Sequence, residues 1–479
     1  MDRRSVIAMM VGTAAWVAGR GAMAEGKSEA GAPLASTNNA LAPNKALDAA
    51  LEAILNSPAQ PLSSLSVLAV KAGKAVYHQQ FGAKWIDVAN PANNKPADAA
   101  TMYRIASISK LVTTIGVMKL VDMGKLNLDA DVSQYLGYTF RNPHYADTPI
   151  TLRQMLSHTS SLRDDAGYYW EASLKLGLRD VLLPGGVGYG KGAMWARNAK
   201  PGVYFQYANL PWGVIGSVME SVTGERFDRL MRRLVLDPMA LPGGFHPADL
   251  SDADLANVAT LYRKRTEVNG KEVWNSSGPW VPQVDDHSKR RPAPRALPDY
   301  KVGTNGTLFG PQGNCRLSAA GLAEIMLMLM NNGVHRGKVI LKPATVAEML
   351  REQWRHNGKG EKVAGGSNGD PNGEADFGSA RRLMNAWGLG NQHFLDITGA
   401  GNGDRLVRGG GYRAYGHLGD AWGLKSAMVF NPFSRDGMIY LIGGHGVDPE
   451  TTPGEYSGLY RHEEKILDAL YTLAVNPAQ

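Results

Sequence analysis

The sequence contains only one cysteine, and its net charge is small for its length. Its single cysteine, Cys315, cannot form an intrachain disulfide and cannot build a cysteine-rich zinc site. The 51 Lys and Arg residues outnumber the 44 Asp and Glu residues by so little that the formal net charge is only +7. The basic cluster Lys289-Arg290-Arg291 has no aromatic residues interleaved with it, unlike a typical nucleic-acid-binding surface. We therefore expect neither a disulfide scaffold nor a nucleic-acid partner.

A long apolar run at the N-terminus is also missing. The apolar run over residues 6–17 is shorter than the roughly 20 residues that a membrane-spanning helix needs. Arg3 and Arg4 precede it, and the small-residue site Ala22-Met23-Ala24 follows, so a secretory signal over residues 1–24 is favoured over a membrane anchor. The arginine pair also resembles a twin-arginine export signal. We expect a periplasmic or secreted protein without a stable membrane anchor after signal removal.

The rest of the chain has the composition of a globular protein, with 44% hydrophobic and 20% charged residues. Residues 25–42 are rich in Ala, Gly, Ser, Pro and Asn and are predicted to form a flexible leader before a domain over 43–475. Strand patterns lie near both ends of this domain, and helical patterns lie outside and between them. They predict an α+β fold, an antiparallel sheet flanked by N- and C-terminal helices, with a mostly helical subdomain inserted over about 125–320. The strand segments are 66–71, 75–81, 427–430 and 438–442.

Two segments of this domain, 267–300 and 357–380, are rich in Gly, Pro, Asn or charge and have no regular hydrophobic pattern. We expect both to be long surface excursions, the first of them a solvated loop. The second contains Gly365-x-Ser367-x-Gly369, which matches the nucleophile-elbow pattern of other hydrolases. That pattern requires a strand before the serine and a helix after it, and neither is predicted here, so Ser367 is not favoured as a nucleophile.

A candidate nucleophile lies instead at the start of a predicted helix over 107–123. Ser107 and Lys110 are three residues apart, so their side chains lie on one face of that helix. A serine hydroxyl needs a base, and a buried amine loses its proton more readily than an exposed one, which suits Lys110 to that role. The helix N-terminus adds backbone N–H donors where an oxyanion would develop. Because Ser-x-x-Lys also occurs by chance, a surface serine beside a solvated lysine is the alternative.

Three further blocks follow in order: the segment 148–162, which contains Ser157-His158-Thr159-Ser160, then Tyr207-Ala208-Asn209, then His417-Leu418-Gly419-Asp420. With the Ser-x-x-Lys block they resemble the serine β-lactamase and DD-peptidase superfamily, specifically its class C β-lactamase-like branch of esterases, D-aminopeptidases and carboxypeptidases. The resemblance runs from about Leu47 to Leu473. It implies a serine hydrolase with a β-lactamase-like fold. The histidines show no paired metal-ligand spacing such as His-Glu-x-x-His, so we expect no metal and no other cofactor.

The resemblance also implies catalytic roles. Ser107 would be the acylated nucleophile, and Lys110 would activate it. Tyr207 would be the general base and acid, which requires that a nearby ammonium group such as Lys110 lowers the pKa of the phenol. Asn209 would form hydrogen bonds with Lys110 and with a substrate amide. A packed aromatic residue and a helix cap are the alternative interpretations of Tyr207 and Asn209, and His158 is expected in a core or capping role.

The third block would bind the substrate. The backbone N–H groups of Ser107 and Asp420 would form the oxyanion hole, and His417 and Gly419 would contact the substrate. Many members of the superfamily have Lys-Thr-Gly where this chain has His417-Leu418-Gly419. A lysine there would bind the carboxylate of a β-lactam or peptide, whereas a histidine need not be charged at pH 7. This weakens the β-lactamase interpretation, and a purely structural His417 is the alternative.

The acyl group of the substrate stays open at this point. A small-molecule ester, an amide, a D-amino-acid peptide and a β-lactam are all compatible with the motifs, and a cell-envelope polymer is a further candidate partner. A penicillin-recognising or envelope-binding protein with little turnover is the alternative function. With the nucleophile assigned to a serine, Cys315 is expected to be a structural thiol.

Overall fold

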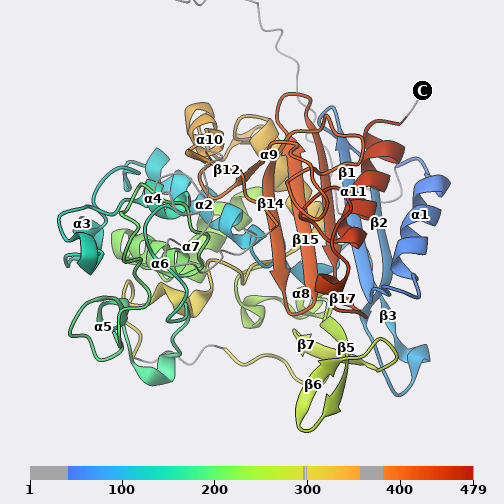
Figure 1. The fold of residues 1–479 in the computed structure, drawn as a ribbon, viewed down its shortest axis with the longest axis horizontal. Coiled ribbons are helices and arrows are strands. Elements are labelled where there is room, and N and C mark those ends of the chain that lie inside the picture. Colours follow the sequence, from blue (N-terminus) through green and yellow to red (C-terminus); the bar gives the residue numbers. More distant parts are fainter. Residues whose placement is uncertain (1–40, 295–296, 298, 357–380, 478–479) are drawn as a thin grey trace, which may run out of the picture.

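The two ends of the chain meet in one nine-stranded antiparallel sheet (Figure 1). The computed structural model describes residues 41–294, 297, 299–356 and 381–477. The predicted signal (1–24), most of the predicted leader (25–42) and the predicted excursion 357–380 lie outside the described residues. The spatial order of the strands is β11 (Trp354–Arg355), β12 (Ala386–Trp387), β13 (Gln392–Phe394), β14 (Ala414–Ala421), β15 (Leu424–Asn431), β16 (Asp436–Ile442), β1 (Ser64–Lys71), β2 (Lys74–Trp85) and β3 (Lys95–Pro96). This confirms the predicted α+β fold.

Alternating side chains of the central strands build two hydrophobic cores, one on each face of the sheet. Leu68 and Val70 of β1 belong to one core, and Leu65 and Val67 belong to the other. Successive side chains of a strand point to opposite faces, so a strand that is covered on both faces is apolar throughout. This is why the segment 438–442 shows a continuous apolar run rather than an alternating pattern.

Helices cover both faces of the sheet, as Figure 1 shows. The N-terminal and C-terminal helices pack against each other on one face, and Asn44 connects them because its Nδ2 donates to Leu473 O at 2.8 Å. On the opposite face, helices α2 and α9 contact the sheet, and the second hydrophobic core lies between these helices and the strands. The bounds are α1 (Lys45–Leu55) and α11 (Arg461–Leu470), with a π-helical turn over Tyr471–Val475, on the first face, and α2 (Ile108–Asp122) and α9 (Ala319–Met330) on the second.

The region between α2 and α9 is helical in its first half and contains a small sheet in its second. That sheet corrects the prediction of a solvated loop over 267–300, since β6 and β7 lie within this segment and pair with β5. Strands β5 and β6 are rich in Lys, Arg and Glu, β6 is mostly exposed, and the short β7 is only partly buried. They therefore lack the apolar alternation by which a strand is recognised. The helices are α3 (Ser133–Leu136), α4 (Leu152–Leu156), α5 (Leu178–Leu182), α6 (Leu210–Thr223), α7 (Phe227–Met231), a π-helical turn (Arg232–Leu236) and α8 (Asp252–Ala256); the strands are β5 (Leu261–Val268), β6 (Lys271–Trp274) and β7 (Trp280–Val284).

The remaining short elements connect these parts. Strand β4 leads into α2 and pairs with β8, and the β9–β10 hairpin and α10 follow α9 along the chain. Strand β17 joins the small sheet by pairing with β5. Their bounds are β4 (Met102–Arg104), β8 (Arg316–Ser318), β9 (Val334–His335), β10 (Lys338–Val339), α10 (Pro343–Leu350) and β17 (Gly444–His445).

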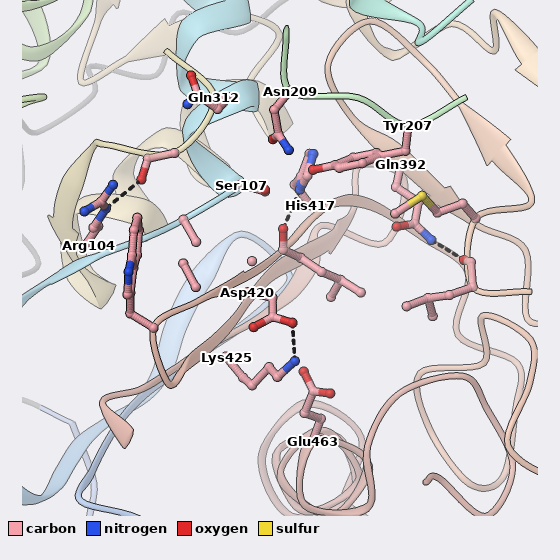
Figure 2. A pocket seen from close by; sticks show the side chains of 18 of the residues that line it. Arg104, Ser107, Tyr207, Asn209, Gln312, Gln392, His417, Asp420, Lys425 and Glu463 are labelled. Carbon is pink, nitrogen blue, oxygen red and sulfur yellow. Dashed lines mark hydrogen bonds and ion pairs between the residues drawn. The ribbon is translucent and has the colours of Figure 1, made fainter. Parts of the chain in front are cut away.

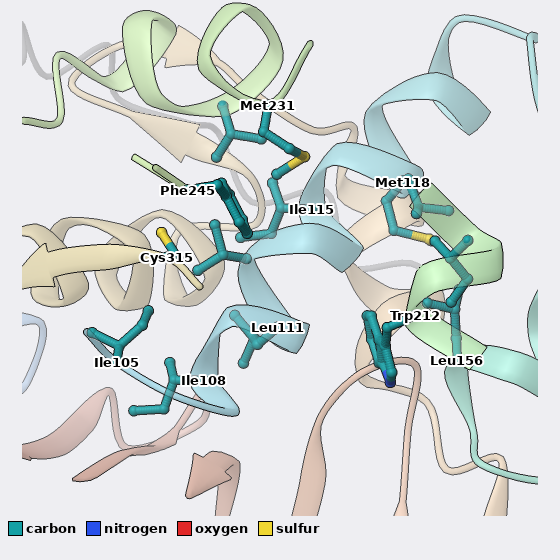
Figure 3. Packing of buried hydrophobic residues seen from close by; sticks show 14 of the residues in the cluster. Ile105, Ile108, Leu111, Ile115, Met118, Leu156, Trp212, Met231, Phe245 and Cys315 are labelled. Atoms are coloured by element: carbon teal, nitrogen blue, oxygen red, sulfur yellow. The ribbon is translucent and has the colours of Figure 1, made fainter. Parts of the chain in front are cut away.

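Helix α2 lies inside the larger core (Figure 3). Ile108, Leu111 and Ile115 are all fully buried, and polar residues of the helix are buried with them, so α2 is covered over most of its circumference. Cys315 packs in the same core, where burial raises the pKa of its thiol to about 12. The buried thiol agrees with the structural role expected for it. A helix packed on all sides holds the residues at its N-terminus in fixed positions.

Strand β14 carries a glycine that the sheet requires. Gly416 has a φ of +149°, and a Cβ at this position would lie 1.9 Å from Met428 O on β15. We expect Gly416→Ala to reduce the free energy of unfolding by about 2 kcal/mol or more, because the strand must shift or adopt a strained backbone. Thermal or urea denaturation measures this. Gly409→Ala is the control, since nothing lies within 4 Å of its Cβ; equal losses in both variants would contradict the prediction.

Candidate active site

Ser107 stands at the junction of β4 and α2. The preceding residue, Ala106, has a φ of +46°, so the chain turns sharply between strand and helix. Ser107 itself has helical dihedral angles and directly precedes the first residue of α2. The first N–H groups of a helix have no partner within the helix. The sequence therefore places the hydroxyl and the backbone N–H of Ser107 together at the start of a buried helix.

Lys110 is fully buried beneath Ser107. Its Nζ lies 3.0 Å from Ser107 Oγ, 2.8 Å from Asn209 Oδ1 and 3.2 Å from Gln312 O. These three acceptors satisfy the three donors of the ammonium group. Burial lowers the pKa of Lys110 to about 7, and the negative charge of Asp164 opposes this effect. A substantial fraction of the amine is therefore unprotonated near neutral pH, in direct contact with the serine.

Asn209 is held by a carboxylate that sequence reasoning missed. Asp164 accepts from the backbone N–H of Asn209 at 2.8 Å, from its Nδ2 at 2.8 Å, and from Leu210 N at 2.9 Å. Because Asn209 Nδ2 faces Asp164, Asn209 Oδ1 faces Lys110. Asn209 also precedes α6, so Asp164 supplies the cap for the start of this helix from a distant part of the chain.

Tyr207 is partly buried, and its ring lies 4.8 Å from Lys110 Nζ. His158 stacks on it with ring centroids 4.4 Å apart, and His158 Nδ1 accepts from Ala208 N at 3.2 Å. The buried His158 thus has the core and capping role expected of it, and it holds the Tyr207 segment in place. Burial raises the pKa of Tyr207, and a hydrogen bond with the Ser107 side chain opposes this only in part. The expected lowering of the Tyr207 pKa by Lys110 is therefore wrong, because the loss of hydration is the larger effect.

Strand β14 passes directly beside the turn that precedes Ser107. A Cβ on Gly419 would lie 2.6 Å from Ile105 O and 2.3 Å from Ser426 Oγ, so only a glycine permits this approach. Ser426 Oγ also donates to Ile105 O at 3.3 Å. The close packing brings the next residue of the strand, Asp420, to the same pocket as Ser107.

His417 lies on the same strand, and its ring faces the Tyr207 ring at a centroid distance of 6.2 Å (Figure 2). Its Nδ1 is 2.5 Å from Leu418 O, so this nitrogen carries the proton. Burial, with the nearby Lys110, lowers the pKa of His417 to about 3. The residue is therefore a neutral imidazole, as the motif allowed.

One pocket contains these groups (Figure 2). It brings together all the predicted site residues except Lys110, which lies behind Ser107 and contacts it. Residues that the motifs did not indicate also line it. Among them are Arg104 and Trp422, which form a cation–π pair, and Lys425, which forms an ion pair with Asp420. Its polar and aromatic lining residues include Arg104, Ser107, Asp164, Tyr168, Tyr207, Asn209, Gln312, Arg381, His417, Asp420, Trp422, Lys425, Tyr460 and Glu463.

Two further findings concern the described residues as a whole. They include no group of three or more His, Cys, Asp or Glu side chains arranged to hold a metal ion. None of the helices in this part of the chain has the length and apolar character that crossing a membrane requires.

Two proteins of known sequence are similar to this chain over about a third of its length. The protein Flp of Staphylococcus aureus (strain MRSA252) is 28% identical over 176 residues, which are 36% of this chain and 33% of Flp. The D-alanyl-D-alanine-carboxypeptidase/endopeptidase AmpH of Escherichia coli (strain K12) is 26% identical over 164 residues, which are 32% of this chain and 38% of AmpH. The chain thus matches little more than a third of the length of these relatives.

A solved structure and a family model cover much more of the chain. A penicillin-binding protein homologue from Caulobacter crescentus superposes with a TM-score of 0.56 at 16% identity, over 90% of this chain and 98% of that one. The similarity shows a shared fold. The model of the Beta-lactamase family matches residues 47–455, a span that includes the Ser107 block, the Tyr207 block and the His417 block. The chain therefore belongs to the Beta-lactamase family, whose members are serine hydrolases.

Proposed function

We propose that the protein is an exported serine hydrolase that cleaves a small ester or amide through an acyl-enzyme at Ser107. The observation that carries this proposal is the contact between Ser107 Oγ and the buried Lys110 Nζ at 3.0 Å. A serine becomes nucleophilic only when a base accepts its proton. The lowered pKa of Lys110, about 7, makes its neutral amine that base at physiological pH.

Acylation follows from this arrangement. Lys110 takes the proton of Ser107 as Oγ attacks the carbonyl carbon of the substrate. The backbone N–H groups of Ser107 and Asp420 stabilise the negative charge that develops on the carbonyl oxygen. Tyr207 retains its proton because burial raises its pKa, so it donates that proton to the leaving group. The proton taken up by Lys110 then restores the phenol.

Deacylation uses the same groups in reverse. Water gives a proton to the neutral Lys110 as its oxygen attacks the acyl carbon, and Ser107 Oγ leaves with a proton from Tyr207. Lys110 returns its proton to Tyr207, which regenerates the starting state. Lys110 is thus the base and Tyr207 the acid in both halves, in contrast to the role of base expected for Tyr207.

The name of one relative, AmpH, agrees with this chemistry at the level of reaction type. AmpH is named as a carboxypeptidase and endopeptidase, so it cleaves peptide bonds. Export rests on the N-terminal sequence, where Arg3 and Arg4 precede the apolar run and a small-residue site ends it. We propose the periplasm or the extracellular space as the location and a class C-like mode of catalysis for the enzyme.

A panel of substrates tests the proposal. Short-chain aryl esters, D-alanyl peptides and a chromogenic cephalosporin are incubated with the protein, and both turnover and intact mass are recorded. We expect turnover of at least one class and a transient mass increase equal to the acyl group. A stable adduct with negligible release would instead favour the alternative, a penicillin-recognising or envelope-binding protein.

Asp164 provides a test of how the site is held together. Removing its charge should lower the pKa of Lys110 further and release the Asn209 amide. We expect Asp164→Asn to reduce kcat/KM by about tenfold and to move the acidic limb of its pH profile to lower pH. Asp165→Asn is the matched control, because the neighbouring Asp165 pairs with Arg163 instead. An acidic limb that does not move in Asp164→Asn would contradict this role.

A further inference from the structure

Asp420 brings a negative charge to the oxyanion hole, in which its own backbone N–H is one of the two proposed donors. The carboxylate is connected to that N–H only through Cα and Cβ, so it lies close to the oxygen that the N–H would bind. Asp420 and Ser107 also line the same pocket. A second negative charge beside a developing oxyanion raises the energy of the tetrahedral intermediate. A group that neutralises Asp420 would remove this penalty.

Lys425 is placed to neutralise it. Asp420 on β14 and Lys425 on β15 lie directly opposite each other in the sheet, and Lys425 Nζ forms an ion pair with Asp420 Oδ2. Figure 2 shows the amine pointing at the Asp420 carboxylate. Side chains that are directly opposite in an antiparallel pair share one face of the sheet. The register of β14 and β15 therefore fixes this ion pair at the oxyanion hole.

Lys425 is buried more deeply than its partner. Its side chain is 8% exposed, whereas the Asp420 side chain is 36% exposed. The Tyr460 ring lies 4.3 Å from Lys425 Nζ and adds a cation–π contact but no charge. Burial lowers the pKa of His445 to about 3, and Lys425 adds to this effect, so His445 is neutral as well. The buried ammonium group thus depends on a carboxylate partner.

Glu463 is the other carboxylate that could compete for Lys425, because it lines the same pocket. Its two oxygens accept instead from the Tyr440 hydroxyl at 2.5 Å and from Tyr460 N at 2.9 Å. Among the described residues, the ion pair of Lys425 is with Asp420 and not with Glu463. The charge of Lys425 is therefore directed at Asp420.

We propose that Lys425 is a positioning residue of the oxyanion hole, which neutralises the Asp420 carboxylate so that the Asp420 N–H stabilises an oxyanion without opposition from its own side chain. Lys425 acts through Asp420 rather than on the reacting atoms. This inference rests on the proposed function, because it concerns the oxyanion hole of that same site. The alternative is an ion pair that only holds the β14–β15 hairpin together, in which case the Asp420 charge has no effect on catalysis.

A double-mutant cycle tests the inference, with the substrate of the panel that the wild type cleaves fastest. Lys425→Met leaves the Asp420 charge uncompensated, so kcat should fall by about tenfold or more while KM changes by less than about threefold. Asp420→Asn, added to this variant, removes the charge, so the double variant should regain at least about fivefold in kcat. A smaller loss in Lys425→Met, or a smaller recovery in the double variant, would overturn the inference.

Lys84→Met is the matched control for the loss of a buried ion pair. Lys84 is 8% exposed and pairs with Asp98 at 2.6 Å, but it is not among the residues that line the pocket. The variant should lose thermal stability, as Lys425→Met should, yet keep kcat within about twofold of the wild type. A loss of kcat in Lys84→Met as large as that in Lys425→Met would show that lower stability alone slows catalysis, and would overturn the inference.

Phenylboronic acid provides a second measurement, which holds even if Lys425→Met fails to fold. Ser107 Oγ forms a bond with boron, the serine proton passes to Lys110, and the boron becomes tetrahedral and negatively charged. Asp420→Asn removes a negative charge beside this adduct and keeps Lys425, so the dissociation constant measured by calorimetry should fall by about threefold or more. A smaller decrease, or an increase, would overturn the inference while leaving the proposed function intact. If the wild type cleaves no substrate of the panel and does not bind phenylboronic acid, the proposed function itself fails, and the inference fails with it.

Discussion

Ser107→Ala is expected to reduce turnover by at least about 10⁴-fold, because no other group can form the acyl-enzyme once the nucleophile is removed. The change deletes one partly exposed oxygen and its contact with Lys110, and it leaves the packing of α2 untouched. The fold should therefore be retained. Ester hydrolysis and intact mass measure the loss of turnover and of the adduct, and circular dichroism verifies the fold.

The sequence offers a sharp control for this experiment. Ser367 is the serine of the competing Gly-x-Ser-x-Gly pattern, and it lies outside the described residues. Ser367→Ala should leave turnover within about twofold of the wild type, because a serine that does not form the acyl-enzyme is not required for turnover. Retained turnover in Ser107→Ala, or its loss in Ser367→Ala, would reverse the assignment of the nucleophile.

Lys110→Met is expected to reduce kcat/KM by about 10³-fold, the size of a typical general-base contribution. In the wild type, kcat/KM should rise with pH through about 7, as Lys110 loses its proton. The variant should lack this rise. Lys119→Met is the matched control, because Lys119 lies on the same helix and donates to Ile340 O instead. A variant that keeps the rise near pH 7 would exclude Lys110 as the base.

The same substitution should stabilise the protein. The pKa of Lys110 is about 7 in the folded protein, whereas an exposed lysine in the unfolded chain has a pKa of 10.5. Between these two pH values the unfolded chain therefore binds more protons than the folded protein. The wild type therefore becomes more stable as the pH rises from about 7 to about 10.5. Lys110→Met removes the free-energy cost of burying the amine, so the variant should be more stable than the wild type at pH 7, as measured by urea denaturation. Loss of activity with a gain in stability would distinguish a catalytic role from a folding defect.

The sequence predicts the framework of the site because its chemistry is encoded locally. Ser107 and Lys110 lie on one helical face through their spacing alone, and the strands at both ends of the domain follow from their apolar runs. The motif blocks also indicate Tyr207 and His417, and the structure brings both to the pocket that contains Ser107. Local patterns carry this information since each depends on a few neighbouring residues.

The features that were missed depend on contacts between distant segments. Asp164 stands in an ordinary polar stretch, and only the folded chain brings it to Asn209. The pKa of Tyr207 depends on how completely the rings of His158 and Trp387 and other groups exclude water from it, which no motif reveals. The sequence did offer one signal, since Asp164 lies only two residues after Leu162, where the motif block over 148–162 ends.

The pairing of β1 with β16 constrains when the protein can acquire its shape. Leu65 pairs with Ile442, so the central sheet joins a strand made early in synthesis to one made near its end. Until β16 has been synthesised, the apolar strand β1 lacks one of its two neighbours in the sheet. Such long-range pairing slows folding and leaves apolar surface exposed in the meantime. We therefore expect β1 to be prone to aggregation until β16 has been made. Deleting β14, β15 and β16 would remove the partner of β1 as well as His417.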